Sequence, residues 1–290
     1  MIYQTAKAWQ QAEQKRILLF GMSGVGKTHL ANMLRDCGDW FHYSVDYRIG
    51  TRYMGEEIVD NFRREAMKNP FLAGLLKSDS ICLESKITFK NLDPLSTYLG
   101  KPGSAEQGGI PFAEYCRRQT LHREGEIAAL RDTIAFIHKA QDIYRYRNFV
   151  CDSGGSICEV IDPDNPADAL MALLSHHILP VWIRGSDDLT QELVKRFNRS
   201  PKPMYYEPDF LQEAWDAYLA AEASTEDTVD PNAFIRWTFA RVIARRTERY
   251  EAMAHHWGVT VASEDVVDAR DERELVDLIA HAIDRRASLS

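Results

Sequence analysis

Short apolar runs alternate with helical patterns along most of the chain. Apolar, aromatic and β-branched residues predict five buried strands, within residues 17–20, 41–50, 148–155, 176–185 and 257–263. Apolar residues at helical spacing predict helices between and after them, as in residues 54–68, 187–197, 234–256 and 271–286. Strands separated by helices favour parallel βαβ units, whose ligands bind beyond the carboxyl ends of the strands.

A glycine-rich turn follows the first predicted strand. Residues 18–30 read LLFGMSGVGKTHL, and Gly21, Gly26, Lys27 and Thr28 have the spacing of a phosphate-binding P-loop. Glycines allow backbone N–H groups to surround a polyphosphate, the lysine reaches the β- and γ-phosphates, and the threonine hydroxyl is suited to Mg²⁺. The alternative is a chance turn, but the strand before it and the helical spacing after it favour nucleotide binding. The predicted nucleotide-binding residues are Gly21, Met22, Ser23, Gly24, Val25, Gly26, Lys27, Thr28 and His29.

The order of these patterns predicts an α/β fold, the P-loop NTPase three-layer sandwich, with a roughly five-stranded parallel sheet and large helical insertions. Turn clusters and helical patterns from residue 69 onward interrupt the core, and prolines and an acidic, threonine-rich tail precede residue 233. We therefore expect five segments: core over 1–68, a mainly helical insertion over 69–146, core over 147–198, a lid-like segment over 199–232, and C-terminal core over 233–290. The lid-like segment is expected to order when nucleotide binds.

Charge and composition limit the classes of partner that we expect the protein to bind. A net charge of −8 and a pI near 5.6 leave no basic footprint for nucleic acid, so none is expected as a partner. The chain shows no apolar signal core and no run of membrane-spanning length, and its five cysteines lack CxxC pairing, so we expect a cytoplasmic protein with reduced thiols and no membrane partner. The two His-His pairs lack the spacing of a zinc site.

Two aspartates at predicted strand ends are candidates for chemistry. Asp152 ends the run FVCD, where a carboxylate next to a P-loop holds Mg²⁺ together with Thr28, although aspartates at such positions also form turns. Asp46 is a candidate to bind, and to deprotonate, an acceptor hydroxyl, and the alternative is a solvated residue at a strand end.

Taken together, the motifs resemble those of the P-loop small-molecule kinases, the superfamily of shikimate kinase and the nucleoside-monophosphate kinases, and are most similar to shikimate kinase-like proteins. Beyond GMSGVGKT, the stretch VDYRI resembles a strand-end Asp-x-x-Ile, NFRRE resembles a Phe-Arg helix, and SGGS resembles a glycine pair. The resemblance implies substrate contacts at Asp46, Arg63, Gly154 and Gly155.

The resemblance extends to the C-terminal third of the chain. RTERYEAMA is similar to an Arg-x-x-x-Tyr…Ala segment, which implies that Arg246 contacts an anionic group of the substrate. LVKRFNRSPKP falls at the place of a mobile lid, so Arg196, Arg199 and Lys202 are candidates to close over the phosphates, with Arg199 taken as catalytic beside Lys27, Asp46 and Asp152. Two departures concern the substrate: Ser44 stands where these kinases carry an acid, and Asp152 where they carry a small neutral residue.

The leading hypothesis is an enzyme that transfers the γ-phosphoryl group of ATP, bound with Mg²⁺, to a hydroxyl of a small, anionic acceptor. The alternative is an NTPase switch or ATPase module whose insertions bind a protein or nucleic acid. Against it, the chain has no NKxD motif and no second acidic residue directly after Asp152. A nucleotide-binding regulator that has lost catalysis is a third possibility, which Ser44 would suit.

Overall fold

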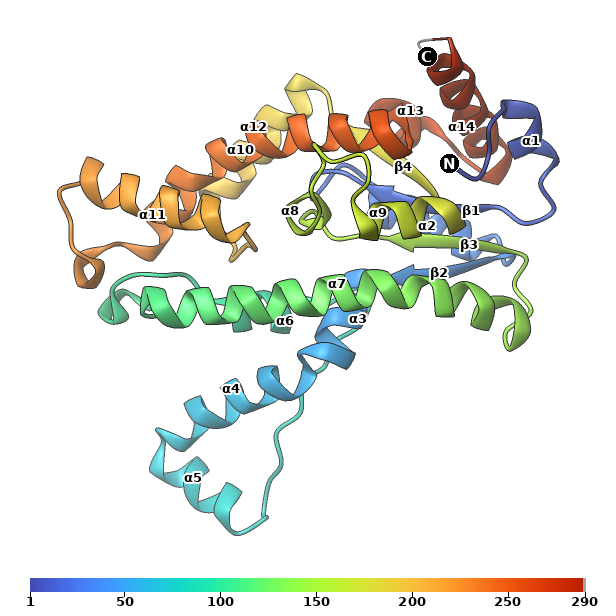
Figure 1. Cartoon of the computed structure of the whole chain (residues 1–290). Coiled ribbons are helices and arrows are strands. Elements are labelled where there is room, and N and C mark those ends of the chain that lie inside the picture. The colour runs from blue at the N-terminus through green and yellow to red at the C-terminus, as the bar shows by residue number, and fades with distance from the viewer. Residues whose placement is uncertain (289–290) are drawn as a thin grey trace. The chain divides into compact units, whose positions relative to one another are not determined.

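The computed structural model describes residues 1–288 of the chain, which forms two compact units. Unit 1 comprises Met1–Val45, Leu130–Pro201 and Arg236–Ser290, and unit 2 comprises Asp46–Ala129 and Lys202–Ile235. Unit 1 contains the sheet and the P-loop, and unit 2 is mainly helical (Figure 1). Helices α7 (Phe112–Asp142) and α12 (Pro231–Trp257) each contribute residues to both units.

Unit 1 is built on a five-stranded parallel sheet in the order β2-β3-β1-β4-β5. The strands are β1 (Arg16–Phe20), β2 (Trp40–Ser44), β3 (Asn148–Asp152), β4 (Leu179–Arg184) and β5 (Val259–Ala262). The predicted α/β fold and its five strands are confirmed. One boundary is corrected: the second strand ends at Ser44, and Asp46 lies in helix α3 (Val45–Arg48) because the chain turns into a helix directly after the strand.

The helices of unit 1 lie before, between and after the strands. They are α1 (Ala6–Gln11), α2 (Lys27–Asp36), α8 (Ile157–Val160), α9 (Ala169–His177), α10 (Asp187–Arg199), α13 (Ser263–Asp268) and α14 (Glu272–Ala287), together with parts of α7 and α12. Among residues 1–288, no helix is long and apolar enough to cross a membrane.

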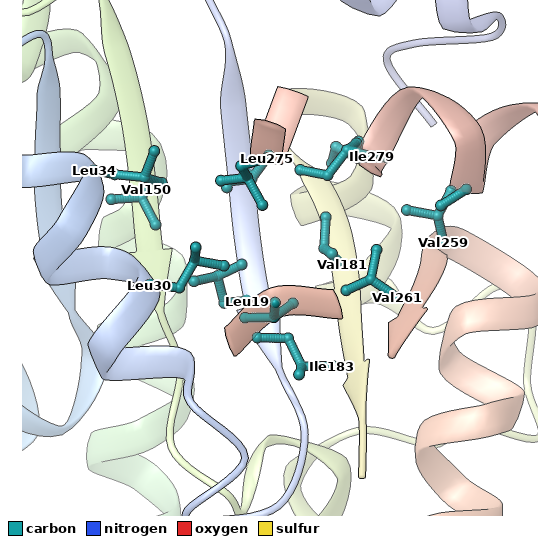
Figure 2. Close-up of a cluster of buried hydrophobic side chains, with 14 of the residues drawn as sticks. Leu19, Leu30, Leu34, Val150, Val181, Ile183, Val259, Val261, Leu275 and Ile279 are labelled. Atoms are coloured by element: carbon teal, nitrogen blue, oxygen red, sulfur yellow. The ribbon is translucent and has the colours of Figure 1, made fainter. Parts of the chain in front are cut away.

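One face of the sheet carries the main hydrophobic core. Alternate residues of β1, Ile17 and Leu19, point to this face and are fully buried, as strand alternation requires. They pack with Leu30 of α2 and Ile279 of α14, and helices α1 and α13 add further apolar side chains (Figure 2). Burial of this many aliphatic side chains, at roughly 1.5–3 kcal/mol each, supplies most of the stabilisation of unit 1.

Aromatic side chains cover the opposite face. Phe20, the residue after Leu19, meets Tyr250 of α12 with ring centroids 6.0 Å apart, so successive β1 side chains serve opposite layers. Tyr43 of β2 packs on Phe136 of α7 at 4.8 Å, and Phe149 of β3 lies 6.2 Å from Tyr43. Helices therefore cover both faces, and unit 1 is a three-layer α/β/α structure.

Unit 2 is held together by its own buried contacts. Its elements besides the shared helices are the π-helix Ile49–Tyr53, α4 (Gly55–Met67), α5 (Pro70–Lys77), α6 (Asp93–Leu99), α11 (Pro208–Ala221) and two 3₁₀ turns, Ala105–Gln107 and Glu226–Thr228. Phe112 of α7 stacks on Trp215 of α11 with centroids 4.5 Å apart, and Arg118 of α7 donates to the backbone carbonyl of Tyr98 and to Asn61 Oδ1. Residues 202–232 of the predicted lid-like segment 199–232 thus contain an ordered helix, α11, that packs within unit 2.

Burial separates the five cysteines into reactive and protected thiols. Cys37 and Cys82 are exposed, whereas Cys151 and Cys158 are buried, and burial raises the pKa of Cys158 to about 12. Burial also raises the pKa of the partly covered Cys116. Because the thiolate is the reactive form, we predict that a thiol reagent near pH 8 modifies two cysteines of the native protein quickly and all five after denaturation. Peptide mapping identifies the modified residues, and rapid native labelling of Cys158 would contradict the described packing.

Candidate functional site

The P-loop connects the end of β1 at Phe20 to the start of α2 at Lys27. Gly26 caps α2 with a φ of +102°, in the left-handed region where a residue without a Cβ fits best, and no side chain caps the helix. Its carbonyl accepts the first helical hydrogen bond from the N–H of Leu30 at 2.9 Å. The first N–H groups of α2 therefore point into the loop, an arrangement suited to phosphate oxygens.

Lys27 lies across this loop. Its side chain is buried, and its Nζ donates to the backbone carbonyls of Gly21 at 2.8 Å and Met22 at 2.9 Å. The ammonium is thus held at the mouth of the turn rather than in solvent. A positive charge fixed beside the N-terminus of a helix adds to the attraction of that position for a polyphosphate.

Sheet register brings Asp152 to Thr28. Strands β1 and β3 are parallel neighbours in which Leu19 pairs with Asp152, so β3 ends beside the start of the P-loop. Thr28 Oγ1 donates to Asp152 Oδ2 at 2.7 Å, and the carboxylate is buried. On its other side, His42 Nε2 of β2 lies 3.8 Å from the same Oδ2.

A hydroxyl and a carboxylate are hard oxygen donors of the kind that Mg²⁺ prefers. Within residues 1–288, no group of three or more His, Cys, Asp and Glu side chains could hold a metal ion alone. The two oxygens therefore fit a Mg²⁺ ion that takes its other ligands from phosphates and water, as nucleotide-bound Mg²⁺ does.

The glycine pair predicted from SGGS lies against the P-loop. Ser153 Oγ donates to the carbonyl of Leu19 at 2.8 Å and ties the turn after β3 to the end of β1. A Cβ placed on Gly155 would lie 3.2 Å from the backbone nitrogen of Ser23, so a side chain there would require the backbone of the P-loop to shift. Gly155 thus lies beside the P-loop, and Gly154 directly precedes Gly155 in the chain.

Arg246 is buried and paired with an acid that the sequence analysis did not single out. Its Nε donates to Glu159 Oε1 at 2.9 Å, and Arg245 Nε lies 3.7 Å from Glu159 Oε2. Burial by itself lowers the pKa of Arg246, but the carboxylate of Glu159 outweighs it and raises that pKa above its usual value. The guanidinium of Arg246 therefore stays charged inside unit 1.

Two neighbours of Arg246 on α12 also contact the segment after β3. Arg249 Nε donates to the carbonyl of Cys158 at 2.7 Å and its Nη2 to that of Ile161 at 2.9 Å, while Tyr250 Oη donates to that of Gly155 at 2.5 Å. Burial raises the pKa of Tyr250 well above its usual value, so its hydroxyl remains a donor. The i, i+3, i+4 spacing in RTERY was the available signal, since it places all three side chains on one helix face.

Of the predicted lid residues, Arg196 lies next to the P-loop. A Cβ placed on Gly24 would lie 2.6 Å from Arg196 Nη2, so the guanidinium covers the loop at that glycine. Arg199 is exposed in the last turn of α10, and Lys202 belongs to unit 2, where its Nζ lies 3.6 Å from Asp93 Oδ1. His29 is exposed in the first turn of α2.

The remaining two predicted residues belong to unit 2. Asp46 is half-buried in α3, and Arg63 of α4 is about half exposed, with its Nη1 2.8 Å from Asp60 Oδ1. Arg63 also lines a hollow of about 460 Å³ on unit 2. Its other lining residues are Gly50, Thr51, Gly55, Glu56, Val59, Leu83, Glu84, Ser85 and Ile87.

Comparison with known proteins finds similarity only at the level of structure. No protein-family model matches the sequence, and no curated protein is similar to it in sequence. A crystal structure of shikimate kinase from Bacteroides thetaiotaomicron is similar to 95% of this chain and 97% of its own, with 13% sequence identity and a TM-score of 0.38. Fold and site together define an α/β protein with a P-loop, and the geometry of that loop, not this likeness, supports the chemistry proposed below.

The buried pair Glu159–Arg246 generates a stability prediction. Glu159→Gln leaves the Arg246 charge buried without its counter-ion, and we expect it to lower the free energy of unfolding by about 3–5 kcal/mol. The double variant Glu159→Gln/Arg246→Met should lose less than the sum of the two single variants, because it leaves no fully buried charge without its counter-ion; Arg245, which also faces Glu159, is 32% exposed. Urea unfolding measures the cycle.

Glu192→Gln is the matched control, because it removes one partner of the exposed Glu192–Lys195 pair and should change stability little. Strictly additive losses at Glu159 and Arg246 would show that the pair is not coupled.

Proposed function

We propose that the protein transfers the γ-phosphoryl group of ATP, bound as its Mg²⁺ complex, to a hydroxyl of a small anionic acceptor. The observation that carries this proposal is the 2.7 Å hydrogen bond from Thr28 to Asp152. Thr28 directly follows the buried Lys27 of the P-loop in the chain. A P-loop lysine, a P-loop hydroxyl and a strand-end carboxylate are the groups that nucleotide-dependent phosphoryl transfer uses to hold and neutralise its reacting phosphates.

On the nucleotide side, the backbone N–H groups at the start of α2 bind phosphate oxygens, and Lys27 exchanges its two carbonyl partners for the β- and γ-phosphates. Thr28 and Asp152 would hold the Mg²⁺, which supplies charge neutralisation at the transferring group. Arg196 is placed at Gly24 to add positive charge over the loop, and Arg199, one helical turn away, is the second candidate for this role.

On the acceptor side, we assign the hollow of unit 2. Its volume of about 460 Å³ suits a small molecule, and Arg63 supplies a planar cation able to pair with a carboxylate or a phosphate. Asp46, in the same unit, is the proposed partner of the acceptor hydroxyl, with its carboxylate as the proton acceptor. All five cysteines are free, which accords with the reducing cytoplasm that we propose as its location.

One feature favours a second candidate function, an NTPase module that binds a macromolecule through unit 2. Helix α5 reads PFLAGLLK, and Phe71 near its start is 72% exposed. Large exposed aromatic side chains are typical anchors of protein interfaces. This candidate and the kinase share the nucleotide site and differ in what stimulates nucleotide consumption.

The first experiment measures ATP consumption by the purified protein with a metabolite pool and, separately, with a macromolecular fraction. Stimulation by the metabolite pool, with transfer of label from γ-³²P-ATP to a small molecule, supports the kinase. Stimulation only by the macromolecular fraction supports the NTPase module instead.

Lys27→Ala is the matched inactive variant for these assays. We expect it to remain folded and to lose turnover by about 10²-fold or more, which is the usual cost of removing one preorganised group that stabilises transition-state charge. Circular dichroism checks the fold. Unchanged turnover in Lys27→Ala would exclude the P-loop as the reaction site.

Asp152→Asn tests the metal assignment. The amide retains an acceptor for Thr28 but lacks the negative charge that attracts Mg²⁺, so we predict weaker binding of nucleotide with Mg²⁺ and little change without it. Titration of a fluorescent ATP analogue with Mg²⁺ or with EDTA measures both affinities. Equal losses under the two conditions would make Asp152 a structural residue.

A further inference from the structure

The segment from Asp152 to Ile161, here called the β3–α8 segment, contains a glycine-rich turn and little regular structure, although Ser153 bonds to Leu19 and the side chains of Ile157 and Cys158 are buried. It runs from the end of β3 through a Gly-Gly pair to the four-residue helix α8. Glycines contribute no side-chain packing and carry the largest conformational entropy, so such a turn is mobile unless other elements fix it. Yet this segment carries Asp152, and its Gly155 lies against Ser23 of the P-loop.

One face of α12 supplies further attachments. Arg246, Arg249 and Tyr250 make at least four hydrogen bonds to the β3–α8 segment, and three of these go to backbone carbonyls. The fourth is the bond from Arg246 to the carboxylate of Glu159, a side chain only 1% exposed. These attachments are spread from Gly155 to Ile161, so they fix the segment at several points along its length.

We propose that Arg246, Arg249 and Tyr250 are positioning residues that hold the β3–α8 segment against the P-loop and thereby set Asp152 for Mg²⁺. This inference rests on the proposed function and changes the role of one residue in it: Arg246 acts through Glu159, not on the acceptor. The arginine is 3% exposed, and an acceptor anion would have to displace a buried carboxylate already bonded to it. Arg246, Arg249 and Tyr250, here called the clamp residues, thus act on the Mg²⁺ side of the proposed reaction.

Tyr250→Phe is the sharpest test. It removes only the hydroxyl that donates to Gly155 and keeps the ring that packs on Phe20 and Trp182. Tyr3→Phe is the matched control, since the Tyr3 hydroxyl also donates to a backbone carbonyl of unit 1, that of Gln14 at 2.9 Å. A second variant, Arg249→Lys, loses the contact of one guanidinium with two backbone carbonyls and keeps the test independent of the folding of Tyr250→Phe. Arg286→Lys is its control, because Arg286 likewise donates to backbone carbonyls, those of Gly258, His255 and His256.

Two measurements are made on each variant of the full chain. The first is amide hydrogen exchange without nucleotide at Ser153 and Glu159, whose N–H groups donate to the carbonyls of Leu19 and Ser156. The second is the gain in affinity for a fluorescent ATP analogue when Mg²⁺ replaces EDTA. A loss of overall stability alone would weaken binding under both conditions and leave this gain unchanged.

We expect faster exchange at both amides in Tyr250→Phe and Arg249→Lys, and a fall of roughly tenfold in the Mg²⁺-dependent gain, the lower end of what loss of an outer-shell partner costs a metal site. Tyr3→Phe and Arg286→Lys should leave both quantities unchanged. Unaltered exchange, or an unaltered gain, in the clamp variants overturns the inference. Failure of the proposed function would be seen separately, as an absence of nucleotide binding by the parent protein, and the exchange data would still decide whether the clamp exists.

Discussion

The hydrogen bond from Thr28 to Asp152 is the contact on which the interpretation of this molecule depends. It joins residues 124 positions apart in the chain, and it forms because β1 and β3 are parallel neighbours whose ends coincide. The carboxyl ends of parallel strands lie on the same side of a sheet. A loop that follows one strand therefore lies close to a side chain at the end of the neighbouring strand. The order of the central strands thus brings the Asp152 carboxylate to the P-loop.

Local pattern was sufficient for much of the fold. The buried strands, the helix after the glycine turn and the parallel arrangement all follow from apolar periodicity, and Lys27 and Thr28 from spacing. Asp46 was placed wrongly at a strand end because aromatic and β-branched residues continue past Ser44, although the chain turns into a helix at Val45. Those side chains favour a strand, but the chain forms helix α3 instead, because tertiary context often outweighs the strand preference of individual residues.

The partner of Arg246 lay beyond the reach of pattern. Glu159 is 87 residues away in sequence, and nothing in the run SICEV distinguishes an ion-paired acid from a solvated one. The hollow lined by Arg63 was equally inaccessible, since residues 83–87 have no periodicity that predicts their return to α4. In both cases the sequence identifies a plausible arginine, and only the three-dimensional packing shows what it faces.

The two edge strands of the sheet have a consequence for how the protein behaves at high concentration. The strand at one edge, β5, has only four residues and is followed at once by helix α13, while on the other edge strand, β2, Phe41 and Tyr43 pack against Phe136 of α7. An open edge is a template on which a strand of another molecule can pair, and a short edge strand offers few backbone groups for it. The four residues of β5 therefore leave little backbone at that edge for a strand of another molecule to pair with.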